Sequence, residues 1–125
     1  MRKLCILFCG FLLCACSAKT YTKEEQRLIS KAEEIMEYLQ NEEYDKIVKE
    51  FSILAGPTHG LASIIQREWE MMPAEYGEFL GVDRYTIIHL KNGSQVKIIT
   101  NYEHYKVQFS ISFLSNGRIS GFYFR

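Results

Sequence analysis

The sequence predicts an α+β domain in which three N-terminal helices pack on a four-stranded antiparallel meander. Apolar residues recur at helical spacing between about residues 23 and 72. From Tyr105 to Phe113 they alternate strictly with polar residues, as in a strand with one dry face. Asn92-Gly93 and Asn116-Gly117 predict hairpin turns, because a type I′ turn needs positive φ at both central residues. We therefore expect the helices to cover the dry face of the sheet.

The first sixteen residues have the form of a cleaved secretory signal. Arg2 and Lys3 form a short positive start, and the apolar run from Leu4 to Leu13 is too short to span a bilayer. The segment ends in Leu13-Cys14-Ala15-Cys16, which resembles the lipobox of bacterial lipoproteins. This resemblance implies that residues 1–15 are removed and that Cys16 is acylated. An ordinary secretory signal or a short membrane anchor is the alternative.

All four cysteines lie in this segment, so cleavage would leave only Cys16 and no disulfide. It would shorten the chain from 125 residues to 110 and leave 13 basic against 15 acidic side chains. Such a near-neutral chain favours neither nucleic acid nor an anionic membrane surface. We expect residues 22–125 to form one domain, with residues 16–21 as the lipidated cysteine and a short tether. The acyl chains would hold it in the cell envelope, at the periplasmic face of an outer membrane or the outer face of a plasma membrane.

Three helices are predicted before the sheet. Thr22-Lys23-Glu24-Glu25 fits a capping box and starts the first helix, which Asn41 ends. Its apolar stripe comprises Leu28, Ile29, Ala32, Ile35, Met36 and Leu39. A second stripe runs through Tyr44, Ile47, Val48, Phe51 and Leu54. After a break over residues 55–60, a third helix is predicted from about Leu61 to Met72, with Pro73 near its end. Its inner side comprises Leu61, Ile64, Ile65, Glu68 or Trp69, and Met72.

Counting outward from the turns predicts the register of the four strands. The first turn places His89 opposite Val96, Ile87 opposite Ile98 and Tyr85 opposite Thr100. A middle turn at Glu103-His104 pairs Tyr102 with Tyr105, Thr100 with Val107, Ile98 with Phe109 and Val96 with Ile111. The last turn pairs Phe113 with Ser120, Ile111 with Phe122 and Phe109 with Phe124. All three turns give the same dry face, and a slip of one residue would have inverted a strand.

The helical and C-terminal motifs resemble one known family. Leu39–Phe51, L-Q-N-E-E-Y-D-K-I-V-K-E-F, resembles the helix-turn-helix opening of small bacterial domains in the nuclear transport factor 2-like, cystatin-like superfamily. Trp69, Gly77-Glu78-Phe79 and the ending Ile119–Phe124 resemble the secreted or lipoprotein family called domain of unknown function 3887. The resemblance covers roughly residues 24 to 125. It implies a cone in which a curved sheet wraps a long helix around a pocket, a fold that serves enzymes, binding proteins and dimerisation modules.

Six residues are candidates for the lining of such a pocket: Trp69, Tyr85, His89, Thr100, Tyr102 and Tyr105. His89 lies on the predicted dry face near one end of the sheet, where an imidazole could act as a general acid or base. A rim histidine satisfied by a carbonyl or water is the commoner reading. The tyrosines could orient a small ligand through their hydroxyl groups, or they could simply close the core.

The remaining polar residues suggest no cofactor. His59 and His104 look solvated, and three scattered histidines without a free cysteine make a zinc site improbable. Asp83 and Arg84 would form an ordinary ion pair at a sheet edge. We recognise no nucleophile motif and no phosphate-binding glycine loop in the sequence.

Three functions fit this sequence. The first is a non-catalytic, membrane-tethered envelope domain that binds a small ligand, a peptide or a protein, with a homodimer through the outer sheet face as one form. That face carries Lys97, Asn101, Lys106, Gln108, Ser110, Ser112 and Tyr123 and is mostly polar, which argues against a large permanent interface. The second is an acid-base enzyme of the dehydratase or isomerase kind, with His89 as base and Tyr85 or Asp83 assisting. The third is a spacer domain whose cone is filled.

Overall fold

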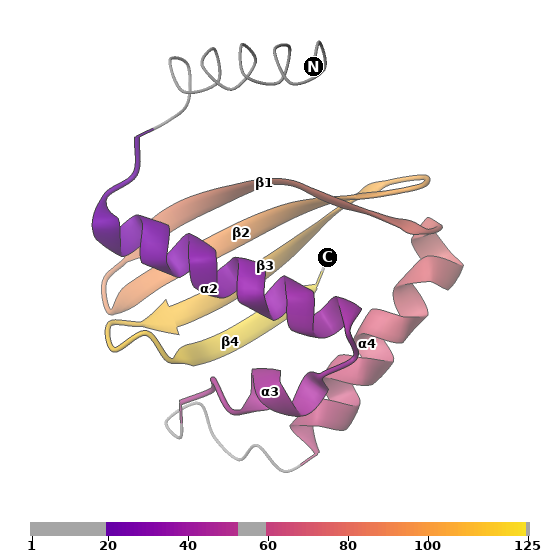
Figure 1. The fold of residues 1–125 in the computed structure, drawn as a ribbon, viewed down its shortest axis with the longest axis horizontal. Coiled ribbons are helices and arrows are strands. Elements are labelled where there is room, and N and C mark those ends of the chain that lie inside the picture. The colour runs from indigo at the N-terminus through magenta and orange to yellow at the C-terminus, as the bar shows by residue number, and fades with distance from the viewer. Residues whose placement is uncertain (1–19, 53–59, 125) are drawn as a thin grey trace, which may run out of the picture.

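The computed structural model describes residues 20–52 and 60–124, which form helices followed by an antiparallel sheet (Figure 1). The elements are α2 (Lys23–Gln40), α3 (Tyr44–Val48), α4 (Leu61–Tyr76), β1 (Phe79–Leu90), β2 (Gly93–Tyr102), β3 (Lys106–Leu114) and β4 (Ile119–Phe124). The predicted α+β class with a four-stranded antiparallel sheet is confirmed. The predicted signal, Cys16 and Leu54 lie outside the described residues. Within the described ranges, no helix has both the length and the apolarity needed to cross a membrane.

Helix α2 begins and ends where the sequence predicts. The Thr22 hydroxyl oxygen accepts from the Glu25 amide at 3.1 Å, and a Glu25 carboxylate oxygen accepts from the Thr22 amide at 2.9 Å, which confirms the capping box. Asn41 forms the C-terminal cap. The buried residues of the helix are Leu28, Ala32, Ile35, Met36 and Leu39.

Helix α3 is shorter than the predicted apolar stripe. It ends at Val48, and Phe51 instead forms a parallel bridge with Ile119 at the start of β4. The Ser52 amide donates to the Ile119 carbonyl and the Ile119 amide donates to the Glu50 carbonyl, both at 2.8 Å. After α3 the backbone therefore leaves the helix and forms hydrogen bonds with the edge strand β4.

Helix α4 is longer than predicted, because Pro73 lies inside it and the helix continues to Tyr76. A proline removes one amide donor and disfavours the preceding turn. Here the last turn is held by the Gly77 amide, which donates to the Pro73 carbonyl at 2.9 Å. The Tyr76 ring also packs edge-on against Tyr102, with centroids 5.9 Å apart. The predicted inner side is partly wrong, since Ile64 is 47% exposed.

The strands follow in the order β1-β2-β3-β4, and the β2–β3 register is the predicted one. The β1–β2 register differs by two residues, because the tip of the turn is Lys91-Asn92 and Leu90 pairs with Gly93. His89 thus lies opposite Ser94 instead of Val96. A shift of two residues keeps every side chain on its face, so the predicted dry face is still correct near this turn.

The β3–β4 turn also departs from the type I′ prediction. Gly117 has φ of 86°, but Asn116 is not among the residues with positive φ. The Gly117 amide donates to the Leu114 carbonyl at 2.8 Å, which is the pattern of a longer turn ending in a bulge. Phe113 consequently pairs with Ile119 instead of Ser120, while the predicted pairs Ile111–Phe122 and Phe109–Phe124 are confirmed.

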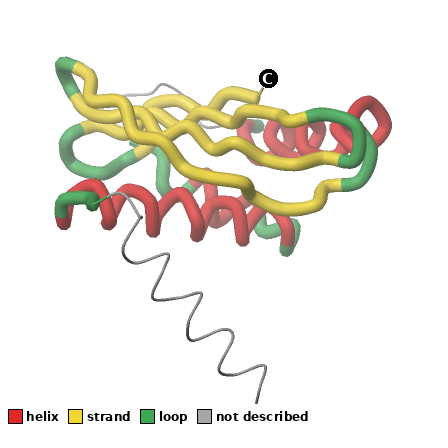
Figure 2. The backbone as a smooth tube through the Cα atoms, turned by 90° about the horizontal axis from the view of Figure 1, so that it is seen from above, coloured by secondary structure: helices red, strands yellow, loops and turns green. Residues whose placement is uncertain are grey.

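The core lies between α2 and the dry face of the two central strands. Figure 2 shows α2 running along one face of the sheet. The strand residues Val96, Ile98, Phe109 and Ile111 are completely buried, as are Ala32 and Leu39 of α2. This layer fixes the sheet on the helix and leaves the two edge strands, β1 and β4, at its margins.

The register predicts the effect of adding a methyl group to Gly93. A Cβ built there overlaps the carbonyl oxygen of Phe113, so we expect Gly93→Ala to lower the free energy of unfolding by about 2–3 kcal/mol. Gly117→Ala is the control, because its Cβ meets only Lys31 Cε at 3.7 Å and the cost is the positive φ alone, about 1 kcal/mol. Urea unfolding of both variants measures the difference. Equal losses would contradict this register.

Candidate functional site

Half of the predicted pocket residues are packed into the core. The Trp69 ring lies edge-on to Phe79 and Phe109, with centroids 5.4 and 6.0 Å away. Thr100 is completely buried, and its hydroxyl donates to the Val107 carbonyl at 2.7 Å. Tyr102 is 4% exposed and donates to the Met72 sulfur at 3.3 Å; burial raises the pKa of Tyr102 to about 12. These side chains fill the space where the sequence predicts a pocket.

The other three predicted pocket residues lie towards the surface. Tyr105 is 60% exposed, with its ring against Tyr76. Tyr85 is half-buried, and burial raises its pKa to about 12. The His89 side chain, near the end of β1, is 63% exposed. The structure therefore does not bring the six residues together in one cavity.

His89 joins the beginning of α2 to β1. Its Nε2 lies 2.7 Å from a Glu25 carboxylate oxygen, and its Nδ1 lies 3.4 Å from the Ser94 hydroxyl. The hydrogen bond from the Thr22 amide lowers the pKa of Glu25 below its ordinary value, and the contact with His89 lowers this pKa further. The acid-base hypothesis needs His89 inside a cavity, and its position in solvent contradicts that requirement. Asp83 pairs with Arg84 at 2.6 Å and with Lys106 at 3.5 Å, as an exposed edge cluster.

Four surface hollows stand out in the part of the chain that the structure describes, and no predicted pocket residue lines any of them. The most apolar, of about 560 Å³, lies between α4 and β4 and is named the α4–β4 groove. Its lining residues are Phe51, Leu61, Ile64, Ile65, Glu68, Phe122, Tyr123 and Phe124. The groove is the candidate functional site.

The aromatic wall of the groove comes from the last strand. Phe122 and Phe124 project from the dry face of β4 and stack with centroids 4.8 Å apart. Phe124 also lies 4.9 Å from the ring of the core residue Phe109. Both phenylalanines remain partly exposed, because β4 is an edge strand and α2 covers the two central strands. One side of the aromatic wall thus packs against Phe109 of the core, and the other side faces the groove.

The opposite wall is the outward side of α4. Ile64 and Met71 are 47% and 59% exposed, two turns apart on that helix. A neighbouring hollow of about 120 Å³ shares Glu68 and Phe124 with the groove and extends it past Met71 and Glu75. The charged residues along both hollows are all acidic. The arrangement is suited to an apolar or positively charged occupant.

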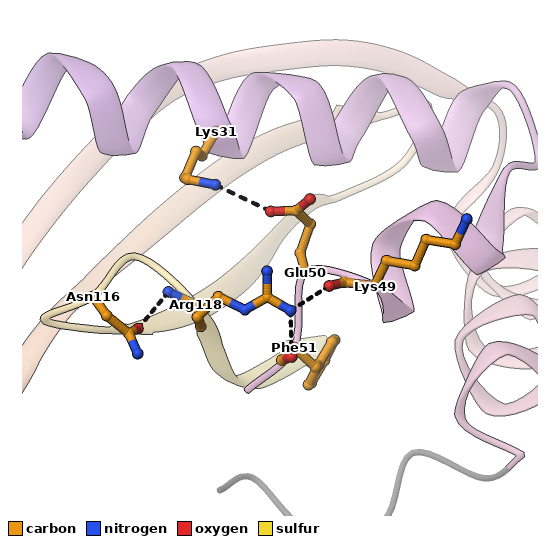
Figure 3. A network of polar contacts seen from close by, with 6 residues as sticks. All are labelled: Lys31, Lys49, Glu50, Phe51, Asn116 and Arg118. Atoms are coloured by element: carbon orange, nitrogen blue, oxygen red, sulfur yellow. Dashed lines mark hydrogen bonds and ion pairs between the residues drawn. The ribbon is translucent and has the colours of Figure 1, made fainter. Parts of the chain in front are cut away.

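An arginine on the β3–β4 turn holds Phe51 in the groove (Figure 3). The Arg118 guanidinium donates to the carbonyls of Lys49 and Phe51, at 2.5 and 3.0 Å. Its backbone amide donates to the Asn116 side chain at 2.9 Å. On the other side of the segment, Lys31 of α2 pairs with Glu50 at 3.0 Å. Contacts from the β3–β4 turn and from α2 therefore fix the backbone that carries Phe51.

Sequence reasoning missed the groove because it assigned Phe51 and Ile64 to buried helical stripes. The available signal was Phe122-Tyr123-Phe124, an aromatic run on a strand that ends the meander and is therefore an edge. Among the described residues there is no group of three or more His, Cys, Asp or Glu that could hold a metal ion.

Comparisons with protein-family models, with curated proteins and with solved structures gave no match for this chain.

Replacement of Arg118 tests how Phe51 is held. We expect Arg118→Met to lower the free energy of unfolding by about 1–2 kcal/mol, because two carbonyls lose a charged donor. Arg84→Met is the control, since Arg84 pairs only with the adjacent Asp83 at the surface and should change stability by less than about 0.5 kcal/mol. Urea unfolding measures both. An Arg118→Met variant as stable as the control would show that the segment is held by other contacts.

Proposed function

We propose that this chain is a lipid-anchored, non-catalytic domain of the bacterial cell envelope that binds an apolar ligand or peptide segment in the α4–β4 groove. The observation that carries the proposal is the groove itself, in which Phe51 and three apolar side chains of α4 face two stacked phenylalanines of β4. A volume of about 560 Å³ falls in the range typical of ligand sites.

The surface around the groove supports binding. Ile64, Met71 and Tyr123 are among the large apolar side chains of the described residues that are more than one third exposed. Gathered exposed apolar side chains are typical of interaction sites, whereas scattered ones are ordinary. Among the described residues, only the segment ending at Ser52 pairs with the outer edge of β4, at Ile119, and an extended peptide could pair with the backbone farther along this edge strand.

The charge of the groove narrows the class of occupant. Glu68 and Glu75 line the two joined hollows without a basic partner among the lining residues. An anionic ligand such as a fatty acid would meet repulsion there, whereas a neutral apolar group or a basic, apolar peptide would not. We therefore favour an uncharged or cationic occupant.

The location and family in this proposal rest on the sequence. The lipobox-like Leu13-Cys14-Ala15-Cys16 supports acylation of Cys16 and attachment to the envelope membrane. A long helix on an antiparallel sheet supports the cone-shaped, cystatin-like architecture and the family called domain of unknown function 3887. The outer sheet face carries a polar hollow lined by Gln95, Lys97, Gln108, Ser110 and Tyr123, which does not favour a stable homodimer there.

A charged residue placed in the groove tests the binding proposal. With Nile red as a neutral apolar ligand, we expect Ile64→Glu to weaken binding at least tenfold, because the carboxylate would have to be desolvated. Leu80→Glu is the control, since Leu80 is also an exposed aliphatic residue but lies on β1, at the opposite edge of the sheet. Fluorescence titration measures both affinities. Equal affinities in the two variants would place the binding site elsewhere.

The anchor is tested by the mass of the protein from bacterial membranes. We expect the mature chain to begin at Cys16 and to carry acyl chains, and Cys16→Ser to release the protein from the membrane fraction. Intact-mass spectrometry of the natural chain and of the Cys16→Ser variant measures the cleavage site and the acylation. A chain that keeps Met1, or an unmodified Cys16, would contradict lipidation.

A further inference from the structure

The exposed apolar residues outside the groove include a pair at the tip of the β1–β2 hairpin. Ile88 and Leu90 are 37% and 48% exposed. They lie opposite Gln95 and Gly93, on the outer face of the sheet, which is otherwise mostly polar. Lys91 follows at the turn and forms no ion pair with any other described residue. The hairpin tip, Ile88 to Lys91, is therefore amphipathic and uncovered.

The hairpin tip lies beside the point where the chain enters the domain (Figure 1). His89 contacts Glu25 in the first turn of α2 at 2.7 Å. The Tyr21 hydroxyl donates to the Tyr85 carbonyl of β1 at 3.4 Å. Lys23, at the start of α2, adds a second cation that has no ion-pair partner among the described residues. The N-terminal end of α2 and the hairpin tip thus form one end of the molecule.

The covalent length of the tether limits how far this end can stand from a membrane. Five residue steps separate Cys16 from Tyr21, and a fully extended chain covers at most about 3.4 Å per step, or about 17 Å in all. If Cys16 is acylated, the beginning of α2 and the adjacent hairpin are held within that distance of the bilayer.

We propose that the β1–β2 hairpin tip is a second membrane contact, with Ile88 and Leu90 in the headgroup region of the bilayer and Lys91 on anionic phosphates. The inference rests on the proposed lipid anchor. Apolar side chains gain free energy on leaving water at the interface, and lysine keeps its charge near the phosphates while its stem lies in the apolar layer. The anchor makes the contact effective, because a weak contact next to a tether forms at high local concentration.

This contact would orient the domain. Strands β2 and β4 run away from the hairpin end, so Phe122 and Phe124 lie towards the far end of β4. Strand β1 is one edge of the sheet and β4 is the other. With the β1–β2 tip on the bilayer, the α4–β4 groove stays open to an occupant from the aqueous side.

The test places a tryptophan at the tip of the membrane-held full chain. Trp69→Phe removes the single natural tryptophan, and Leu90→Trp or Leu80→Trp is added to that background. Leu80 is the matched control, because it is a 62% exposed leucine of the same strand, ten residues and roughly 33 Å from Leu90. The protein is reconstituted in vesicles of phosphatidylcholine and phosphatidylglycerol, with and without brominated acyl chains. Circular dichroism checks that each variant folds.

We expect bromine to quench the Leu90→Trp emission severalfold more than that of Leu80→Trp, with Leu90→Trp also blue-shifted. Vesicles without phosphatidylglycerol should reduce the difference, because Lys91 then loses its anionic partners. Equal quenching of the two variants on floated vesicles overturns the hairpin contact and leaves the anchor intact. A chain that lacks acyl groups by mass and does not float with vesicles overturns the anchor, and the hairpin contact with it.

Discussion

The structure depends on the burial of the dry face of β2 and β3 against α2. Val96, Ile98, Phe109 and Ile111 lose all contact with water there, and Ala32 and Leu39 cover them from the helix. Burial of apolar side chains is the dominant favourable contribution to folding, so this layer sets the position of everything else. One helix is too narrow to cover four strands. The dry side of the edge strands must therefore find other cover, and the α4–β4 groove lies where that cover is incomplete.

The two edges are completed in different ways. Along β4, the segment after α3 pairs with Ile119, and α4 lies across the remaining aromatic side chains without closing on them. Along β1, the end of the strand is attached to the first turn of α2 by the pair of His89 and Glu25. Trp69 and Tyr102 fill the space between helix and sheet where the sequence predicts a pocket. Open apolar surface is thus displaced from the centre of the domain to its margins.

The two proposed binding surfaces, the α4–β4 groove and the β1–β2 hairpin tip, lie at different places on the domain. The end that carries the beginning of α2 and the β1–β2 tip combines exposed leucine and isoleucine with lysine, which suits a lipid surface. The groove at β4 combines phenylalanine and isoleucine with glutamate, which suits a neutral or cationic occupant and would be repelled by anionic headgroups. Lysine beside one apolar surface and glutamate beside the other fit the two different occupants that we propose.

The sequence alone determined the features that depend on local pattern: the capping box of α2, the faces of the strands and the β2–β3 register, where a turn and a period of two agree. It could not detect the two-residue slide between β1 and β2, because such a slide preserves the face of every side chain. The helical period marked Ile64 and Phe51 as apolar, but which surface an apolar residue meets is decided only when the helices are placed on the sheet. For the same reason the sequence placed His89 on the correct face but left open whether it lies in a pocket or at the rim. Tertiary structure alone decided that Pro73 lies within α4 and that the open apolar groove lies at β4, because both depend on contacts between segments distant in sequence.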